Sequence, residues 1–145
     1  MKKAQISVEY MIILSITIAM VIGGAVIFVT YTESSKNQVT KSQISGLGNQ
    51  IIQNAESIYT IGNGSWIVID VDYPKELVDI YIADKEELVF VLDTSEGISE
   101  SIFFSDIALR GTTGSGNKER FGVVQPGKHS IKIESKGDAV LLNTS

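Results

Sequence analysis

Two glycine-rich stretches of this 145-residue chain have spacings close to those of a phosphate-binding loop. In residues 111–118, GTTGSGNK, the glycines fit a P-loop, but Asn117 stands where the lysine is required. Residues 122–129, GVVQPGKH, keep the lysine, but His129 replaces the Ser or Thr that would bind magnesium. A P-loop must also open a helix, whereas residues 130–134 alternate like a strand. We therefore predict two loops between strands and no nucleotide site.

The remaining reactive side chains do not form a recognisable catalytic or metal-binding set. His129 is the only histidine and the chain has no cysteine, so no second histidine or thiol can pair with it. We expect His129 to be a partly exposed residue at a strand start. Four aspartates offer oxygens for calcium, namely Asp70, Asp72, Asp79 and Asp84. They lack EF-hand spacing, which favours a solvated edge. The chain is thus expected to be no enzyme and to need no cofactor.

The charge balance argues against nucleic acid as a partner. Twelve Lys and Arg stand against 17 Asp and Glu, which gives a formal charge of −5. Phosphate backbones are bound by clustered basic residues, and this chain has an acidic excess.

Residues 10–32, YMIILSITIAMVIGGAVIFVTYT, contain no charged side chain. About 20 apolar residues suffice for a helix to cross the hydrocarbon core, so this run is long enough. Ser15, Thr17 and Thr30 can return their hydroxyls to the helix backbone. Lysines at positions 2 and 3 precede the run, which predicts a cytoplasmic N-terminus and a C-terminal domain outside the cell.

Two ordinary explanations of this segment leave features unexplained. A secretory signal peptide has a shorter apolar stretch directly after its basic residues, whereas here residues 5–9, QISVE, intervene. A plain membrane anchor gives no reason for Glu9 at the membrane edge. An ionised carboxylate beside an apolar core is costly unless it is paired, so Glu9 invites a partner.

The segment KKAQISVEY, residues 2–10, resembles the class III signal peptide of archaeal type IV pilins. That family has a short basic leader, a small residue, and then Gln-x-Ser-x-Glu-Tyr opening the hydrophobic helix. The resemblance covers the chain up to about residue 30. Two departures are Ala4, where the family often has Gly, and a leader at the short end of the range.

The resemblance implies that a membrane prepilin peptidase cuts between Ala4 and Gln5. Cleavage would leave Glu9 as the fifth residue of the mature chain, about one helical turn from the new N-terminal amine. In related filaments the carboxylate is thought to meet such an amine on a neighbouring subunit, which registers the subunits as they stack. The implied partners are other copies or other pilins, the peptidase, and membrane lipid before assembly.

Beyond the apolar run the sequence predicts an amphipathic helical extension. Apolar residues recur at steps of three or four, namely Ile44, Leu47, Ile51, Ala55 and Ile58. We expect this stripe to pack on the following domain. Glycines at 46 and 48 weaken the helix and could kink it, and Gly62-Asn63-Gly64 is a plausible stop.

The C-terminal part predicts an antiparallel β-sandwich of short strands. The expected strands are 66–73, 77–83, 88–93, 98–104, 107–109, 121–124, 129–134 and 139–142. Residues 67, 69 and 71 should share one strand face, as should Val78, Ile80 and Ile82. The domains are therefore a leader (1–4), a long helix (5–62) and an extracellular β-domain (63–145), an α+β fold.

Two N-glycosylation sequons, at Asn63 and Asn143, would face outside by this topology. Asn63 lies in a predicted hinge and should be accessible, whereas Asn143 is almost terminal.

The leading hypothesis is a structural subunit of a surface filament used for adhesion, located in the cell membrane before assembly. The alternative is a membrane-anchored module that never polymerises, a minor pilin-like or stator-like protein whose β-domain binds an envelope partner.

Overall fold

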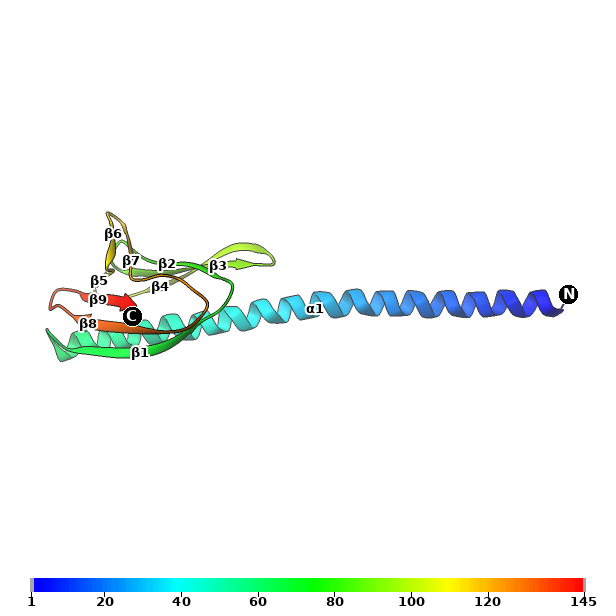
Figure 1. The fold of residues 1–145 in the computed structure, drawn as a ribbon, viewed down its shortest axis with the longest axis horizontal. Coiled ribbons are helices and arrows are strands. Elements are labelled where there is room, and N and C mark those ends of the chain that lie inside the picture. Colours follow the sequence, from blue (N-terminus) through cyan, green and yellow to red (C-terminus); the bar gives the residue numbers. More distant parts are fainter. Residues whose placement is uncertain (1, 145) are drawn as a thin grey trace. The chain divides into compact units, whose positions relative to one another are not determined.

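The computed structural model describes the backbone of residues 2–144 and the side chains of residues 7–114 and 116–144. Over this part of the chain, one helix precedes nine strands, which confirms the predicted α+β architecture with a long N-terminal helix (Figure 1). The elements are α1 (Lys2–Ile61), β1 (Trp66–Tyr73), β2 (Leu77–Ala83), β3 (Glu87–Thr94), β4 (Gly97–Phe104), β5 (Leu109–Arg110), β6 (Thr113–Ser115), β7 (Lys118–Arg120), β8 (Gly127–Ser135) and β9 (Val140–Thr144).

The strands form two sheets that share one apolar core. One sheet has the order β1-β8-β9-β5, and the other has the order β4-β3-β2-β7-β6. Every pairing is antiparallel except that of β5 with β9, which is parallel. The chain divides into two compact units, residues 1–38 and 39–145, so the second half of α1 belongs with the sheets.

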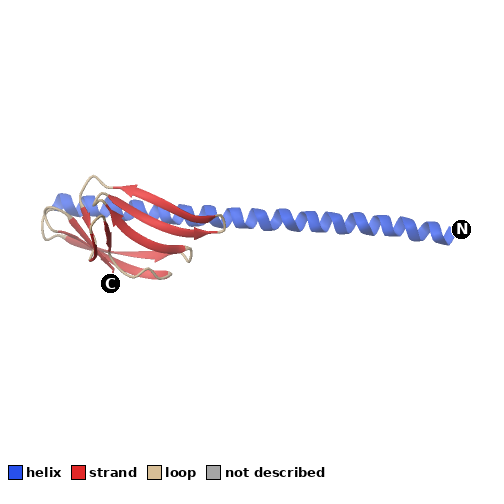
Figure 2. Cartoon of the chain, turned by 90° about the horizontal axis from the view of Figure 1, so that it is seen from above, coloured by secondary structure: helices blue, strands red, loops and turns tan. Residues whose placement is uncertain are grey.

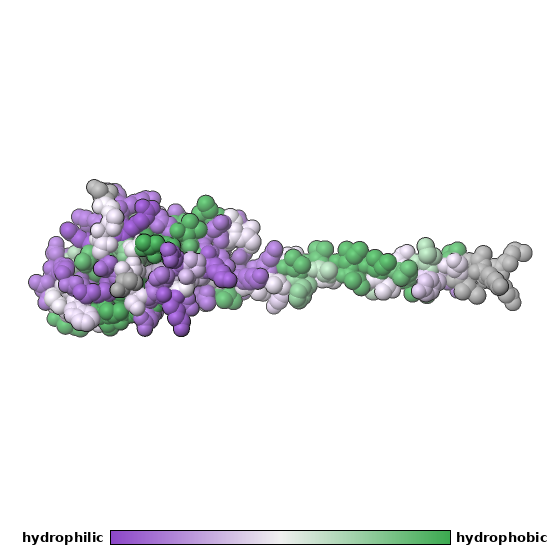
Figure 3. All heavy atoms as spheres, viewed as in Figure 1, coloured by the Kyte–Doolittle hydropathy of each residue, from purple (hydrophilic) through white to green (hydrophobic). Residues whose placement is uncertain are grey.

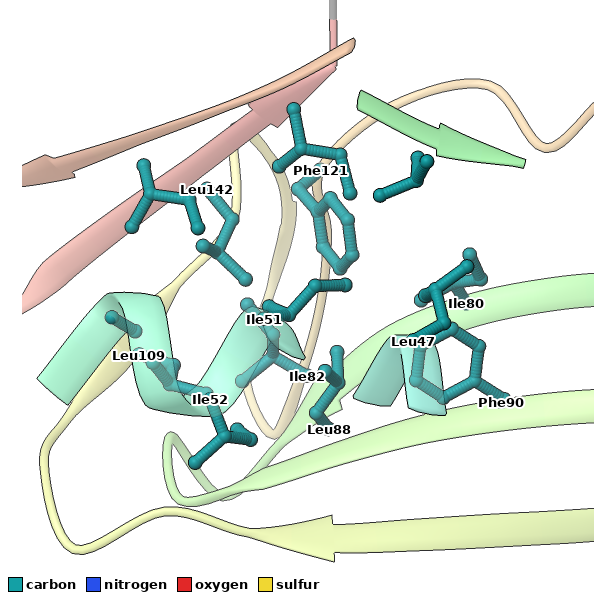
Figure 4. Close-up of a cluster of buried hydrophobic side chains, with 14 of the residues drawn as sticks. Leu47, Ile51, Ile52, Ile80, Ile82, Leu88, Phe90, Leu109, Phe121 and Leu142 are labelled. Atoms are coloured by element: carbon teal, nitrogen blue, oxygen red, sulfur yellow. The ribbon is translucent and has the colours of Figure 1, made fainter. Parts of the chain in front are cut away.

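The C-terminal half of α1 supplies one wall of that core. Its residues Ile44, Ile51 and Ala55 are fully buried and belong to one cluster with side chains of both sheets. Figure 4 shows Ile51 and Ile52 beside Leu109, Ile82 and Leu88, which come from three different strands. The strands run alongside this part of α1 (Figure 2). The predicted amphipathic stripe is thus buried, because the open side of the sheets needs an apolar cover.

The predicted weakness at Gly46 and Gly48 does not interrupt the helix, which is continuous from Lys2 to Ile61. Packing against another side chain explains why a glycine stands at position 48. A Cβ built at Gly48 would lie 2.5 Å from ring carbons of Phe103, whereas a Cβ at Gly46 would meet nothing within 4 Å. The absence of a side chain at Gly48 therefore lets the Phe103 ring approach the helix backbone.

A bulge in β2 places Val78 on the surface. Leu77 pairs with Leu92 and Asp79 with Val91, so Val78 is an extra residue without a partner in β3. Val78 is 57% exposed whereas Ile80 and Ile82 are buried, so the expectation that the three share one strand face is wrong. Because of the bulge, the side chain of Leu77 lies on the core side of β2 and is buried there.

The strands between β4 and β8 also differ from the prediction. Residues 121–124 form no strand, although Phe121 is buried, because its carbonyl accepts hydrogen bonds from the Thr144 amide and hydroxyl instead of joining a ladder. The strand expected at 107–109 begins later, as β5. Within the first glycine-rich stretch the chain forms the β6–β7 hairpin, which was expected to be a loop.

Candidate functional site: the exposed apolar helix

The N-terminal half of α1 is the largest apolar surface that the structure leaves uncovered. From Tyr10 to Tyr31 every large apolar side chain is exposed, from 42% at Leu14 to 74% at Met20. The helix is long and apolar enough to cross a membrane, by length and composition. Figure 3 shows hydrophobic residues over most of this segment, whereas the visible face of the second unit is largely hydrophilic.

The serine and threonine hydroxyl groups in this segment are satisfied within the helix. Ser15 donates to the carbonyl of Met11 at 2.8 Å, Thr17 to that of Ile13 at 2.8 Å, and Thr30 to that of Val26 at 3.0 Å. These contacts confirm the predicted return of the three hydroxyls to the backbone. They let the segment enter an apolar environment without stranding a polar side chain.

The predicted processing and assembly residues lie just before this surface. Glu9 is exposed at its N-terminal edge. Ala4 and Gln5 have helical backbone, but their side chains lie outside the described residues. Their predicted roles at the cleavage site stay predictions.

No protein-family model, no curated protein and no solved structure matches the chain.

The first sequon lies in the turn that ends α1. Asn63 is exposed, between two glycines with positive φ, Gly62 at 115° and Gly64 at 86°. The hydroxyl of Ser65 lies 2.8 Å from the carbonyl of Ile58 and 2.6 Å from that of Gly62. Ser65 thus satisfies carbonyls at the helix end, a structural role independent of glycosylation.

The second sequon lies in the last strand. Asn143 is exposed in β9, directly opposite Lys132 of β8. Its backbone is therefore part of a sheet, whereas that of Asn63 is part of a turn.

Of the residues considered for chemistry, Asp70, Asp72 and His129 line one open surface pocket, whereas Asp79 and Asp84 lie elsewhere. His129 is partly exposed, and its ring stacks on Tyr73 with centroids 5.0 Å apart. Tyr73 is only 2% exposed, and burial raises its pKa to about 12. Neither glycine-rich stretch opens a helix, since β7 follows one and β8 contains the end of the other.

Three of the four aspartates bind neighbouring side chains. Asp70 accepts a hydrogen bond from Ser130 at 2.8 Å, Asp84 one from Asn117 at 2.6 Å, and Asp79 pairs with Arg120 at 2.6 Å. The hydrogen bond from Arg120 lowers the pKa of the Asp79 carboxyl. Across the described residues, no group of three or more metal-ligating side chains comes together.

Sequence reasoning missed that three apolar side chains of β4 are exposed, namely Ile98, Ile102 and Phe104. The neighbouring strand β3 contains the unbroken apolar run LVFVL at residues 88–92, which is typical of a strand covered on both faces. That run is covered, since Leu88 and Phe90 have no exposed area and Val89 on the other face is only 2% exposed.

Proposed function

We propose that this chain is a pilin-like subunit, made as a membrane-inserted precursor and assembled into an extracellular adhesive filament. The observation that carries the proposal is the uncharged helix segment 10–32, whose large side chains are exposed and which directly follows the pilin-like segment QISVEY at residues 5–10. A surface of this kind needs lipid or other helices around it, because water is an unfavourable environment for so much apolar area.

The α+β architecture supports the same proposal. The C-terminal half of α1 has its own core against the sheets, so the N-terminal half is available for another environment. In the membrane precursor that environment is lipid. In the filament it is the corresponding helix of neighbouring subunits, which replaces lipid by similarly apolar side chains.

Glu9 is proposed to set the register of assembly. Cleavage before Gln5 would create an ammonium group about one helical turn before Glu9. Pairing between the Glu9 carboxylate and the amine of an adjacent copy would neutralise both charges in an apolar surrounding.

The test is to express the chain with a prepilin peptidase and to determine the mature N-terminus and the filament content of sheared cells. We expect a chain that starts at Gln5 and is present in filaments. A chain that keeps Met1 and stays in the membrane fraction would contradict the proposal.

A Glu9→Ala variant tests the register mechanism separately. It should be processed normally yet give few or no filaments. Glu33→Ala, which removes an exposed carboxylate just beyond the apolar run, is the matched control and should assemble normally. Normal filaments from Glu9→Ala would rule out the proposed role of Glu9.

A second candidate is a membrane-anchored module that does not polymerise. The exposed apolar side chains Ile98, Ile102 and Phe104 of β4 support it, because such a surface can bind an envelope protein as well as another copy. Mature protein that remains membrane-bound and absent from filaments would favour this candidate.

A further inference from the structure

Strand β4 forms one margin of the five-stranded sheet, and its sequence does not protect this free edge. It stands at the end of the order β4-β3-β2-β7-β6 and is eight residues long. Free edges are normally protected by shortness, by Lys or Pro, or by a bulge. The strand GISESIFF has no Lys and no Pro, and its register with β3 is regular throughout. At the other margin of the same sheet, β6 has only three residues.

The hydrogen-bond pattern between β3 and β4 shows which backbone groups point to the free edge. The Ser105 amide donates to the Glu86 carbonyl at 2.8 Å, which continues the β3–β4 register as a hydrogen-bonded pair. Such pairs alternate along an antiparallel ladder with pairs whose N–H and C=O groups point away from the partner strand. Four residues of β4 therefore present both backbone groups to the free edge, namely Ile98, Glu100, Ile102 and Phe104.

The same four residues carry the exposed side chains of β4. Ile98 is 78% exposed, Ile102 46% and Phe104 72%, and Glu100 between them is exposed as well. The neighbouring strand β3 is covered, since its outward Val89 is 2% exposed. The missing contacts therefore belong to the margin of the sheet. One added strand there would pair with the backbone groups and cover part of the apolar side chains.

The chain around β3 and β4 is acidic and has no basic residue. From Glu86 to Leu109 there are six carboxylates, at positions 86, 87, 93, 96, 100 and 106, and no Lys or Arg. None of the six is in an ion pair across the described residues. Lys118 of β7 lies over the Tyr81 ring of β2, which β3 separates from β4. A strand added to β4 is therefore favoured by a basic residue beside Glu100.

The edge strands of a second copy lack that basic residue. The other long edge strand of this chain is β1, which contains Asp70 and Asp72 and no Lys or Arg. Pairing β4 with β4 or with β1 of another copy would bring only carboxylates to the new ladder, without a basic partner. The complementary strand therefore belongs to a different protein.

We propose that the free edge of β4 binds an extended segment of another protein as an added β-strand. The segment has apolar side chains at alternate positions, which lie beside Ile98, Ile102 and Phe104, and a Lys or Arg beside Glu100. Main-chain hydrogen bonds hold such a segment, and its alternate side chains determine which sequence is selected. This inference goes beyond the proposed function, because it holds whether or not the chain polymerises.

Synthetic peptides test the edge on the detergent-solubilised full-length chain. The extended peptide KTVTVTKTVTK presents Val, Val, Lys and Val in the order that an antiparallel strand needs opposite Phe104, Ile102, Glu100 and Ile98. A fluorescent form should bind in an anisotropy titration, and replacing its central Lys by Glu should weaken binding by about three to ten times. Binding should also protect the amides of these four residues from hydrogen exchange, measured by NMR.

Two variants of the protein separate the backbone contribution from the charge contribution. Ile102→Pro removes an N–H that points to the free edge and leaves the bonds to β3 in place, so it should abolish binding without changing the circular dichroism. Glu100→Lys should reverse the preference, so that the Glu-containing peptide binds more tightly. Glu96→Lys, in the exposed turn before β4, is the matched control and should keep the natural preference. If Ile102→Pro were unfolded, the reversal by Glu100→Lys would decide alone.

The contrary outcomes are distinct from a failure of the proposed function. Equal binding of the two peptides, or unchanged binding by folded Ile102→Pro, would overturn the proposal. Self-association of the natural chain that Ile102→Pro removes, measured by sedimentation, would assign the edge to a second copy and overturn it as well. Filament content tests the proposed function separately, because Ile102→Pro and Glu100→Lys should assemble as the natural chain does. Loss of filaments in both variants would place β4 in a filament contact and count against a different protein there.

Discussion

At the residue scale, Tyr73 carries a hydroxyl that the protein buries without a protein partner. Its side chain is 2% exposed, and its hydroxyl makes no hydrogen bond to the described residues. The raised pKa of about 12 follows from burial, which disfavours the charged phenolate.

The pKa of Tyr73 predicts a loss of stability in alkali. Above pH 10 the unfolded chain releases the phenol proton while the folded chain keeps it until about pH 12. The unfolded state then binds fewer protons, so the free energy of unfolding falls as pH rises. The loss should reach about 2 to 3 kcal/mol between these values.

The measurement is chemical denaturation of the detergent-solubilised protein between pH 8 and about pH 12, followed by circular dichroism. Tyr73→Phe should remove most of this decline and should be as stable as the natural chain at neutral pH, or more stable, because it deletes a buried unpaired hydroxyl. An identical alkaline decline in Tyr73→Phe would assign the effect to other groups.

Substitutions in the turn around Asn63 can separate the effect of glycosylation from the effect of the Ser65 hydroxyl at the helix end. Ser65→Ala removes both the sequon and the hydroxyl that serves the carbonyls of Ile58 and Gly62. We expect it to lower the free energy of unfolding by about 1 kcal/mol even in protein made without glycans. Asn63→Gln removes the sequon alone and should leave that stability unchanged.

Mass spectrometry of protein from the natural host would then show whether Asn63 carries a glycan, which should vanish in both variants. Ser65→Thr is the control that keeps the sequon and a hydroxyl. If unglycosylated Ser65→Ala were as stable as the natural chain, the capping role would be wrong.

At the element scale, two glycines of α1 predict opposite effects of one substitution. The methyl group added by Gly46→Ala would meet no atom within 4 Å. This substitution should stabilise the protein by about 0.5 to 1 kcal/mol, because Ala has a higher helix propensity than Gly. Gly48→Ala places a methyl group against the Phe103 ring and should destabilise it, because the overpacking costs about 1 to 3 kcal/mol and exceeds the propensity gain.

Urea unfolding of the two single variants against the natural chain checks this difference. A double variant, Gly48→Ala with Phe103→Leu, should recover part of the loss if the ring causes it. Equal stabilisation by both alanines would show that the helix and Phe103 do not pack as closely as described.

At the scale of the whole molecule, the exposed helix predicts a dependence on the membrane. Ile18→Arg places a charge near the centre of the uncharged run and should cost about 2.5 to 3.5 kcal/mol of membrane insertion. Most of the protein should then leave the carbonate-resistant membrane fraction. The matched control is Val123→Arg, on an exposed apolar residue of the other unit, which should stay membrane-bound.

The amino-acid sequence by itself determined the features that arise from local periodicity. The uncharged run 10–32, the helical stripe from Ile44 to Ile58 and the bounds of β1 and β2 follow from spacing, since a helix and a strand each repeat over a few residues. The β6–β7 hairpin could also have been found, because Gly116-Asn117 between short runs is a turn signal.

Only the tertiary structure decided which of those faces are covered. Three features depend on contacts between residues far apart in the chain. They are the bulge at Val78, the burial of Phe121 outside any strand, and the approach of Phe103 to Gly48. The exposure of Ile98, Ile102 and Phe104 in β4 has the same origin. Burial is a property of neighbours in space, so the run LVFVL of β3 indicates a need for cover on both faces, and only the fold shows that β3 has this cover whereas one face of β4 does not.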